Sequence, residues 1–366
     1  MDRDLRTEFL TLHEFAAAAR ARLDANGWAY LVGGTETETT LRRNRLALDS
    51  VALRPRVLRD VSAVDAGASC LGKLVRLPVL LAPVGGLELF DPDGALAVAR
   101  AAGAFGVPVM VSSVSPRPKP EIRAATAAPA LFQLYVRGGG RFIEEQVEKT
   151  IAAGMEAFCL TVDTAHYSRR ERDIAGRFMK PWRAEVDAGA RHAQAALSWA
   201  DVSRIRRAYD IPLILKGIAT PEDARIALDH GIDVIYVSNH GGRQLDHGLG
   251  ALDVLPGIAE AVAGQARIWV DGGISRGTDI VKALALGAEA VGIGRLHCYA
   301  LAAAGAPGIV RLLEILEEEL VTALGLLGVT RLDQLNPSCV QRGAPVVTPP
   351  GAFSAFPLLG PENEGP

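Results

Sequence analysis

The chain has 366 residues, of which 49% are hydrophobic, 22% charged and 5% aromatic, and this composition excludes a disordered or fibrous protein. Because 39 basic residues are balanced by 42 acidic ones, the formal net charge is −3, and we expect no general attraction to nucleic acid or to an anionic membrane. The length fits two domains, or one large domain about a hundred residues longer than an ordinary α/β barrel.

Neither the first residues nor the cysteines of the chain suggest secretion or metal binding. The start, MDRDLRTEFL, is polar, and no stretch approaches about 18 uninterrupted apolar residues, so we expect a cytoplasmic protein without a signal peptide or membrane span. The four cysteines are far apart and include no CxxC pair: Cys70, Cys159, Cys298 and Cys339. They are interpreted as buried thiols in a reducing compartment, with neither disulfides nor a metal site.

The first predicted element is a helix. Thr11 and Glu14 form a capping-box pattern before an alanine-rich stretch, and Gly27 is a candidate to close that helix in a left-handed conformation.

From residue 79 onward, eight short apolar runs are separated by predicted helices. Each run is almost continuously apolar, as expected for a parallel strand that is buried on both faces. The helix after the fifth run has readable ends, since Thr220 is a suitable N-cap, Pro221 follows it, and Gly231 comes just before the next run. Gly154 and Gly287 occupy equivalent places. The eight predicted strands are 79–84, 107–113, 130–136, 157–163, 212–217, 234–240, 267–273 and 290–295.

Eight strand–helix units in series favour a closed (β/α)₈ barrel over the alternative, a doubly wound open sheet. We therefore expect a single domain over 1–366, with a helical section at 1–78, the barrel at 79–305, and a helix and tail at 306–366. The fourth and fifth runs start 55 residues apart, at 157 and 212. In a barrel this long connection lies on the catalytic face, so residues 168–200 are a candidate lid.

Polar residues gather where the predicted strands end, which is where barrel enzymes place their chemistry. Lys216 ends an apolar strand, so its ammonium needs either an acidic partner or an electron-rich ligand. His240 supplies a base near neutral pH, and Arg243 offers a carboxylate two parallel donors. Asp163 is placed to hold a nearby imidazole and to stabilise its protonated form.

The last two strands end in glycine-rich segments. Gly272 and Gly273 follow the seventh strand, and Gly294 and Arg295 follow the eighth. Barrels often bind phosphate at these two loops through backbone N–H groups, so we expect a phosphate-bearing ligand. No spacing of histidines and carboxylates suggests a metal site.

The segment SNHGGRQLD at 238–246 resembles the family of FMN-dependent 2-hydroxy acid oxidases and dehydrogenases, which includes glycolate oxidase, lactate oxidase and mandelate dehydrogenase. The resemblance runs from Tyr30 to about Ala323. Shorter segments support it in the family's order: LAPV at 81–84, FQLY at 132–135, LTVD at 160–163, RRERD at 169–173, LKG at 215–217, DGG at 271–273 and IGR at 293–295.

This resemblance implies a role for individual residues. His240 matches the catalytic base and Asp163 the carboxylate that supports it. Lys216 matches the lysine beside the flavin N1–C2 carbonyl edge, where its charge stabilises the anionic reduced flavin. The substrate is held by two arginines and two tyrosines, Arg170, Arg243, Tyr30 and Tyr135. The remaining FMN contacts are Ala82, Pro83, Val84, Ser112, Gln133, Thr161, Ser238, Asp271, Gly272, Gly273, Ser275, Arg276, Gly294 and Arg295.

The implied reaction is oxidation of an (S)-2-hydroxy acid to the 2-oxo acid. His240 accepts a proton and two electrons reach FMN, either as a hydride from Cα or through a carbanion. We expect O₂ as the acceptor, because there is no amino-terminal haem domain and the connection at 168–200 is short and lacks an apolar docking segment. Relatives are commonly tetramers, so a homotetramer is expected.

Departures from the family pattern point to the substrate. Val114 stands where glycolate oxidase carries a tryptophan, and Gly85 and Gly86 replace larger residues, which predicts a wider pocket and a bulky or aryl substrate. Ser275 stands where a phosphate-facing arginine is usual, with Arg276 one place later, so that contact is open.

Three alternatives to this oxidase remain. One is a dehydrogenase of the same family that passes electrons to a quinone or cytochrome. Another is a different FMN barrel, such as an isomerase of phosphorylated substrates. The third is a flavin-binding protein without activity.

Overall fold

The computed structural model describes residues 4–180, 186–344, 354–356 and 358–359. Eight parallel strands close into a barrel in the order β10-β11-β4-β5-β6-β7-β8-β9. The predicted (β/α)₈ barrel is therefore confirmed, and the open sheet is wrong. The strands are β4 (Val79–Leu81), β5 (Val109–Ser112), β6 (Ala130–Leu134), β7 (Phe158–Thr161), β8 (Leu213–Ile218), β9 (Val234–Val237), β10 (Arg267–Val270) and β11 (Ala290–Ile293).

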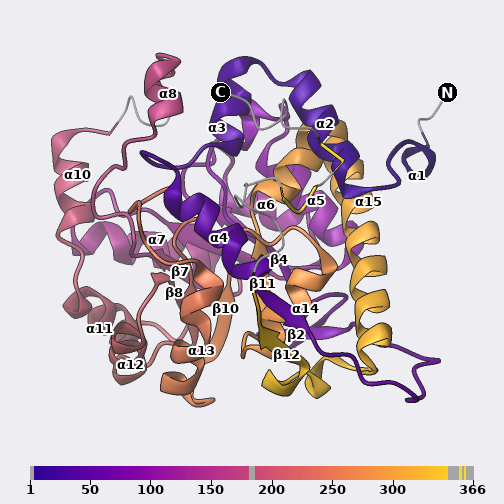
Figure 1. Ribbon diagram of the computed structural model, residues 1–366. Helices are drawn as coiled ribbons and strands as arrows, with labels where there is room; N and C mark the ends of the chain where they lie inside the picture. The colour runs from indigo at the N-terminus through magenta and orange to yellow at the C-terminus, as the bar shows by residue number, and fades with distance from the viewer. Residues whose placement is uncertain (1–3, 181–185, 345–353, 357, 360–366) are drawn as a thin grey trace.

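Helices surround this barrel (Figure 1), and most follow a strand directly. The predicted helix ends are confirmed: Thr220 caps α12, and Gly154, Gly231 and Gly287 have φ of +71°, +67° and +106° just before strands. The helices of the barrel are α5 (Ala95–Phe105), α6 (Lys119–Ala124), α7 (Gly140–Ala152), α8 (Glu171–Ala175), α10 (Ala188–Ala195), α11 (Trp199–Ala208), α12 (Pro221–Asp229), α13 (Ala251–Val262), α14 (Gly277–Ala285) and α15 (Arg295–Leu327).

The amino-terminal section contains α1 (Leu5–Glu8), α2 (Leu12–Arg22), α3 (Ala25–Val32) and α4 (Thr39–Asp49). The capping box is confirmed, since the Thr11 backbone N–H donates to the Glu14 carboxylate at 2.7 Å. The role predicted for Gly27 is wrong. The chain becomes extended at Leu23, and the Asp24 carboxylate accepts from the Gly27 N–H at 2.6 Å, so Gly27 lies in the first turn of a new helix.

The barrel is closed at the end opposite the predicted site. The hairpin of β2 (Ala68–Cys70) and β3 (Lys73–Val75) packs there against a buried cluster that includes Leu80, Tyr236 and Trp269. A second pair, β1 (Val51–Leu53) with β12 (Val340–Arg342), joins the amino-terminal section to the segment after α15. A plugged end leaves the carboxyl ends of the strands as the open face.

The four cysteines are all free thiols. Cys70, Cys159 and Cys298 are buried as predicted, but the prediction is wrong for Cys339, which is only half-buried in a short 3₁₀ turn beside β12.

The long connection after β7 contains α8 and α10, which lie together on one side of the molecule (Figure 1). Residues 181–185 of the candidate lid fall outside the described residues, as do 345–353, 357 and 360–366 of the predicted tail. The long helix α15 is apolar enough to span a membrane by length and composition alone. However, it breaks at Ala304 and Gly305, and 67% of its most apolar window is buried against the rest of the protein.

Candidate active site

Three of the predicted residues meet at the open end of the barrel. His240 follows β9, Asp163 follows β7 and Tyr135 follows β6. The His240 Nδ1 atom lies 3.1 Å from Asp163 Oδ1, and its Nε2 atom lies 3.1 Å from the Tyr135 hydroxyl. His240 adopts φ of +59°, a left-handed conformation that is uncommon outside glycine, and its backbone N–H donates to Ser238 Oγ at 3.0 Å. The backbone is therefore held in a special conformation that aims the imidazole into the barrel mouth.

Burial and charge set the protonation of this pair. The side chains of His240 and Asp163 are only 13% and 12% exposed. Burial lowers the pKa of His240, and the nearby Asp163 carboxylate offsets this only in part, so the imidazole is neutral at pH 7. For Asp163, burial alone would raise the pKa, but the attraction of His240 and Lys216 prevails and holds it below its usual value. The pair is therefore a neutral base beside a carboxylate that stabilises its protonated form.

The close approach of Asp163 depends on a glycine in the neighbouring strand. Gly217 adopts φ of +117°, and a Cβ atom at that position would lie 2.7 Å from Asp163 Cβ. A side chain at position 217 would clash with Asp163, so the glycine after Lys216 in the sequence LKG lets the Asp163 carboxylate approach this strand.

Lys216 has the acidic partner that its burial requires. Its ammonium lies 2.8 Å from Asp271 Oδ2 and donates to Ser238 Oγ at 2.7 Å, while Ser238 donates to Asp271 at 2.6 Å. Burial would lower the pKa of Lys216, but Asp271 and Asp163 more than compensate and raise it. Lys216 also borders the cavity described below. The buried Lys216 therefore has the acidic partner that was one expectation, and it also borders a ligand site, which was the other.

The predicted carboxylate-binding group is also assembled. Arg243 donates to the Tyr30 carbonyl at 2.6 Å, and its guanidinium lies 4.7 Å from the centre of the Tyr30 ring. The Tyr30 hydroxyl donates to the Gly85 carbonyl at 2.8 Å. Arg170 borders the same cavity, and its Nε is buried without a hydrogen-bond partner among the described residues. Burial and the neighbouring Arg170 lower the pKa of Arg243, which shows that this corner favours an anion.

These residues border one cavity of about 560 Å³, a size typical of ligand sites. The predicted residues that line it are Tyr30, Ala82, Pro83, Val84, Tyr135, Arg170, Lys216, His240, Arg243, Asp271, Gly272, Gly273, Ser275, Gly294 and Arg295. The others are not part of its lining: Ser112, Gln133, Thr161, Asp163, Ser238 and Arg276.

Most of these latter residues hydrogen-bond to one another or to residues of the lining. Gln133 Nε2 donates to Thr161 Oγ1 at 2.8 Å, which leaves the buried Gln133 Oε1 without a partner among the described residues. Ser112 Oγ accepts from the Val114 backbone N–H at 3.4 Å. Their predicted contacts with a flavin stay predictions, although the unpartnered Gln133 oxygen suits a ligand N–H.

The glycine-rich segments form a cradle at one end of the cavity. Gly272 and Gly273 have φ of +109° and +86°, and a Cβ at Gly272 would lie 2.9 Å from Asn44 Oδ1 of α4. At Gly294 a Cβ would meet nothing within 4 Å, so that backbone is open. Arg295 donates to two backbone carbonyls, those of Gly241 at 3.0 Å and Gly33 at 2.8 Å. Exposed backbone beside an arginine is suited to a phosphate group.

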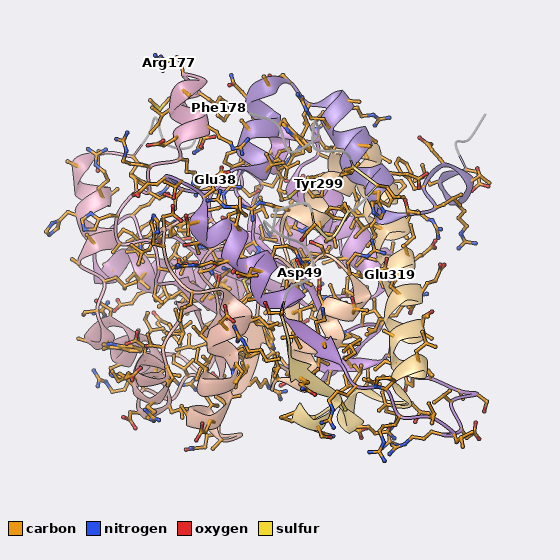
Figure 2. All side chains as sticks on the ribbon, viewed as in Figure 1. Glu38, Asp49, Arg177, Phe178, Tyr299 and Glu319 are labelled. Carbon is orange, nitrogen blue, oxygen red and sulfur yellow. The ribbon has the colours of Figure 1, made fainter. Side chains whose placement is uncertain are left out.

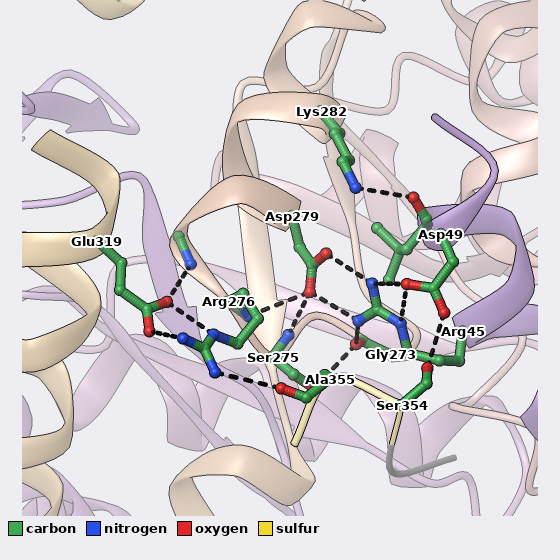
Figure 3. Close-up of polar contacts among 12 residues, drawn as sticks. Arg45, Asp49, Gly273, Ser275, Arg276, Asp279, Lys282, Glu319, Ser354 and Ala355 are labelled. Atoms are coloured by element: carbon green, nitrogen blue, oxygen red, sulfur yellow. Dashed lines mark hydrogen bonds and ion pairs between the residues drawn. The ribbon is translucent and has the colours of Figure 1, made fainter. Parts of the chain in front are cut away.

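The open question about Ser275 and Arg276 now has a geometric answer. Both backbone N–H groups donate to Asp279 Oδ2, at 2.9 and 3.1 Å. The Arg276 guanidinium pairs with Glu319 and donates to the Ala355 carbonyl at 3.2 Å, outside the cavity (Figure 3). Ser275 therefore borders the cavity and Arg276 does not, while the predicted contact of either residue with the FMN phosphate stays a prediction.

Sequence reasoning missed several residues of this cavity lining, among them Arg45, Lys180 and Phe356. Arg45 of α4 is buried, donates to the Gly273 carbonyl and makes a bidentate pair with Asp279 (Figure 3). Lys180 is buried in an ion pair with Asp173, 5.3 Å from the Tyr30 ring centre. Phe356 borders the cavity from the far end of the chain. The only available signal was for Lys180, one of just six lysines, within an apolar stretch.

The residues fit FMN. The cavity offers a buried cation at Lys216 and a glycine cradle with Arg295 for a phosphate, and Gln133, which is not part of the lining, has an unpartnered amide oxygen among the described residues. Among the described residues, no group of three or more histidines, cysteines, aspartates or glutamates is placed to hold a metal ion.

A (β/α)₈ barrel that carries a histidine–aspartate base, an arginine-lined anion site and a phosphate cradle defines a cofactor-dependent enzyme acting on small organic acids. The chain belongs to the FMN-dependent dehydrogenase family, whose sequence profile matches residues 19–342. FMN is the cofactor of this family, and the family includes the 2-hydroxy acid oxidases.

Individual relatives support this placement. An L-lactate oxidase of a Nostoc species is 37% identical, and the match covers 90% of this chain and 97% of the relative. Glycolate oxidase 1 of Zea mays is 36% identical, and the match covers 90% of this chain and 95% of that relative. The crystal structure of a mandelate oxidase is 40% identical, with a TM-score of 0.87, covering 93% of this chain and all of that one. A variant of mandelate oxidase has been solved with an FMN adduct. The family, the fold and the cofactor predicted from the sequence are thus confirmed.

Proposed function

We propose that this enzyme oxidises a bulky, aryl-bearing (S)-2-hydroxy acid to the corresponding 2-oxo acid and passes the electrons to O₂, forming H₂O₂. The contact of His240 with both Asp163 and Tyr135, beside Arg243, is the observation that carries the reaction class. The size of the pocket beside Tyr30 supports the substrate class.

The reaction removes two protons and two electrons from the substrate, R–CH(OH)–COO⁻, and leaves R–CO–COO⁻. Arg243 and Arg170 bind the carboxylate with charge-assisted hydrogen bonds, and Tyr30 closes that corner. His240 Nε2 accepts a proton, and Asp163 stabilises the imidazolium that results. The Tyr135 hydroxyl, 3.1 Å from the same nitrogen, orients the substrate hydroxyl. When bound, FMN would accept the two electrons and the second proton.

The residues that would hold FMN are already arranged around the cavity. Lys216 brings a buried positive charge that favours an electron-rich ring edge, and Asp271 keeps it charged. Gly272, Gly273 and Gly294 would offer backbone groups to the phosphate, and Arg295 would add positive charge.

The substrate class rests on two small residues in the lining. Val114 and Gly85 face each other, since a Cβ at Gly85 would lie 2.5 Å from Val114 Cγ2 and 4.0 Å from the Tyr30 hydroxyl. A larger side chain at either position would reach the corner where Tyr30 and Arg243 hold the carboxylate. The mandelate oxidase structures, at 38–40% identity, include one bound to (S)-2-phenylpropionate, a ligand with an aromatic ring. We therefore favour an aryl substrate over glycolate.

A second candidate is a dehydrogenase that passes electrons to a quinone. Exposed apolar side chains on the connection after β7 favour it: Tyr167 is 48% exposed, Ile174 47% and Met179 71%. Charged residues such as Arg177 separate these side chains, and the expectation that the connection at 168–200 lacks an apolar docking segment stays a prediction. L-lactate dehydrogenases of Caulobacter are as similar in sequence, at 37% identity, as the Nostoc lactate oxidase.

The acceptor is tested by following H₂O₂ and 2-oxo acid together. We expect one H₂O₂ per molecule of mandelate consumed in air, and faster turnover of mandelate than of glycolate. Turnover that requires a quinone analogue, with no H₂O₂, would establish the dehydrogenase instead. The cytoplasmic location and homotetramer expected from the sequence stay proposals, and size-exclusion chromatography of the holoenzyme tests the second.

A further inference from the structure

The carboxyl-terminal segment returns to the phosphate end of the cavity. Ala355 and Phe356 are only 8% and 2% exposed, although they lie almost thirty residues beyond the end of α15 at Leu327. Phe356 lines the same cavity as Gly273 and Ser275. A segment that is so distant in sequence and yet so deeply buried needs contacts that hold it there.

Two polar contacts fix the segment (Figure 3). Ser354 Oγ donates to Asp49 Oδ2 at 2.7 Å, and the Ala355 carbonyl accepts from Arg276 Nη1 at 3.2 Å. The Leu359 N–H also donates to the Phe356 carbonyl at 2.9 Å. The segment is therefore anchored on both sides of the loop that carries the glycine cradle.

Each anchor is connected to the cradle or to its helix. Asp49 accepts from Arg45, which in turn donates to the Gly273 carbonyl at 3.2 Å. Arg276 begins α14 and pairs with Glu319 of α15, which also accepts from the Gly277 N–H at 2.8 Å. Asp49 and Glu319 come from opposite ends of the chain and lie on either side of the segment (Figures 2 and 3).

The aromatic ring of Phe356 completes the wall of the cavity. It packs edge-on against Tyr299, with ring centroids 6.3 Å apart and planes at 87°, and against His13 at 5.7 Å and 76°. Tyr299 also lines the cavity. Such edge-to-face contacts are favourable, and here they link the segment to α15 and α2 across the phosphate end.

We propose that Ser354, Ala355 and Phe356 form a carboxyl-terminal latch over the phosphate end of the FMN site and that this latch slows the dissociation of FMN. The latch uses Arg276, which lies outside the cavity lining, as one of its two anchors. The inference rests on FMN as the cofactor, and it does not depend on the substrate or the electron acceptor proposed above.

The test measures FMN release without substrate, so its outcome is independent of the oxidation. The holoenzyme and its variants are diluted, and free FMN in an ultrafiltrate is followed by fluorescence over time. We expect Phe356→Ala to release FMN about tenfold faster or more, because loss of a buried aromatic wall costs at least the energy of one tenfold step. Ser354→Ala is expected to accelerate release less, and Phe356→Leu to restore most of the retention.

The matched control is Leu358→Ala in the same segment, since Leu358 is 74% exposed and lies outside the cavity lining. It is expected to release FMN at the wild-type rate. The unfolding temperature of the FMN-free forms separates retention from folding. If Phe356→Ala and Ser354→Ala lower that temperature yet release FMN at the wild-type rate, the segment is merely structural and the proposal is overturned. If Phe356→Ala does not fold, Ser354→Ala alone decides, and an unchanged release rate overturns the proposal.

Discussion

The Nδ1 atom of His240 lies 3.1 Å from Asp163 Oδ1, while its Nε2 atom lies 3.1 Å from the Tyr135 hydroxyl. Since Asp163 is ionised and can only accept, Nδ1 carries the proton and donates to it, which leaves Nε2 as the unprotonated nitrogen that accepts from the Tyr135 hydroxyl. The carboxylate therefore fixes the tautomer that the reaction needs, and the substrate side of the imidazole is its basic side.

The first prediction concerns Asp163→Asn and pH. An amide both fails to stabilise the imidazolium and permits the wrong tautomer, so kcat should fall by about 10²–10⁴-fold. Because burial lowers the pKa of His240, wild-type kcat/KM should decline only below about pH 6.5, as the imidazole becomes protonated. Asp163 raises that pKa, so its removal should move the decline to still lower pH. A shift to higher pH in the pH–rate profile would contradict the assignment.

The carboxylate site predicts a difference between arginine and lysine. Arg243→Lys keeps the charge but loses the planar pair of donors, so kcat/KM should fall about 10–100-fold, mostly through KM. Arg169→Lys is the matched control, because Arg169 is 68% exposed and pairs only loosely with Glu171 at 3.9 Å. Steady-state kinetics with mandelate measures both. Equal, small effects at Arg243 and Arg169 would remove Arg243 from the substrate site.

The pocket size predicts a change of substrate preference. Val114→Trp places a large ring against Gly85 and the Tyr30 hydroxyl, so kcat/KM for mandelate should fall at least about tenfold more than that for glycolate. Val57→Trp introduces the same side chain at a position that is 82% exposed and should change neither value. If Val114→Trp lowers kcat/KM equally for mandelate and glycolate, the aryl assignment loses its structural basis.

The buried pair beneath the cradle predicts a stability effect. Arg45 and Asp279 are 4% and 1% exposed, and Asp279→Ala leaves the arginine buried without its bidentate partner. The free energy of unfolding should fall by about 3–5 kcal/mol, and the double variant Arg45→Met with Asp279→Leu should recover much of it. Denaturant unfolding measures both. A single variant as stable as the wild type would show that the pair carries little of the stability.

The same pair gives a pH dependence. Burial would raise the pKa of Asp279, but its attraction to Arg45 and the hydrogen bonds from that arginine outweigh burial and lower it. Its contribution to stability is therefore complete above the unfolded-state pKa of about 3.9 and is lost as pH falls through the lower folded-state value.

The strands and the reacting residues were predictable from the sequence because both depend on local patterns. A continuous apolar run marks a strand that is buried on both faces. The residues at its carboxyl end lie at the barrel mouth, and this placement does not depend on the conformation of the loops. That placed His240, Asp163 and Lys216 correctly. Arg276 could not be placed, because its direction depends on Glu319 and Ala355, which lie 43 and 79 residues away in sequence.

Other misses have the same origin. Gly27 is a plausible helix end by local rules, but the Asp24 cap starts a second helix there. Arg45 and Phe356 reach the cavity only through long-range packing, which no period or motif records.

The central claim is that bound FMN takes two electrons from an aryl 2-hydroxy acid with His240 as the base. The most direct measurement is the visible absorbance of the bound flavin on anaerobic mixing with (S)-mandelate, together with the amount of 2-oxo acid formed. We predict complete bleaching and one 2-oxo acid per flavin in the wild type, and FMN still bound but unbleached in His240→Ala. Flavin that stays oxidised in the wild type across glycolate, lactate and mandelate, or that bleaches equally fast in His240→Ala, would contradict the account.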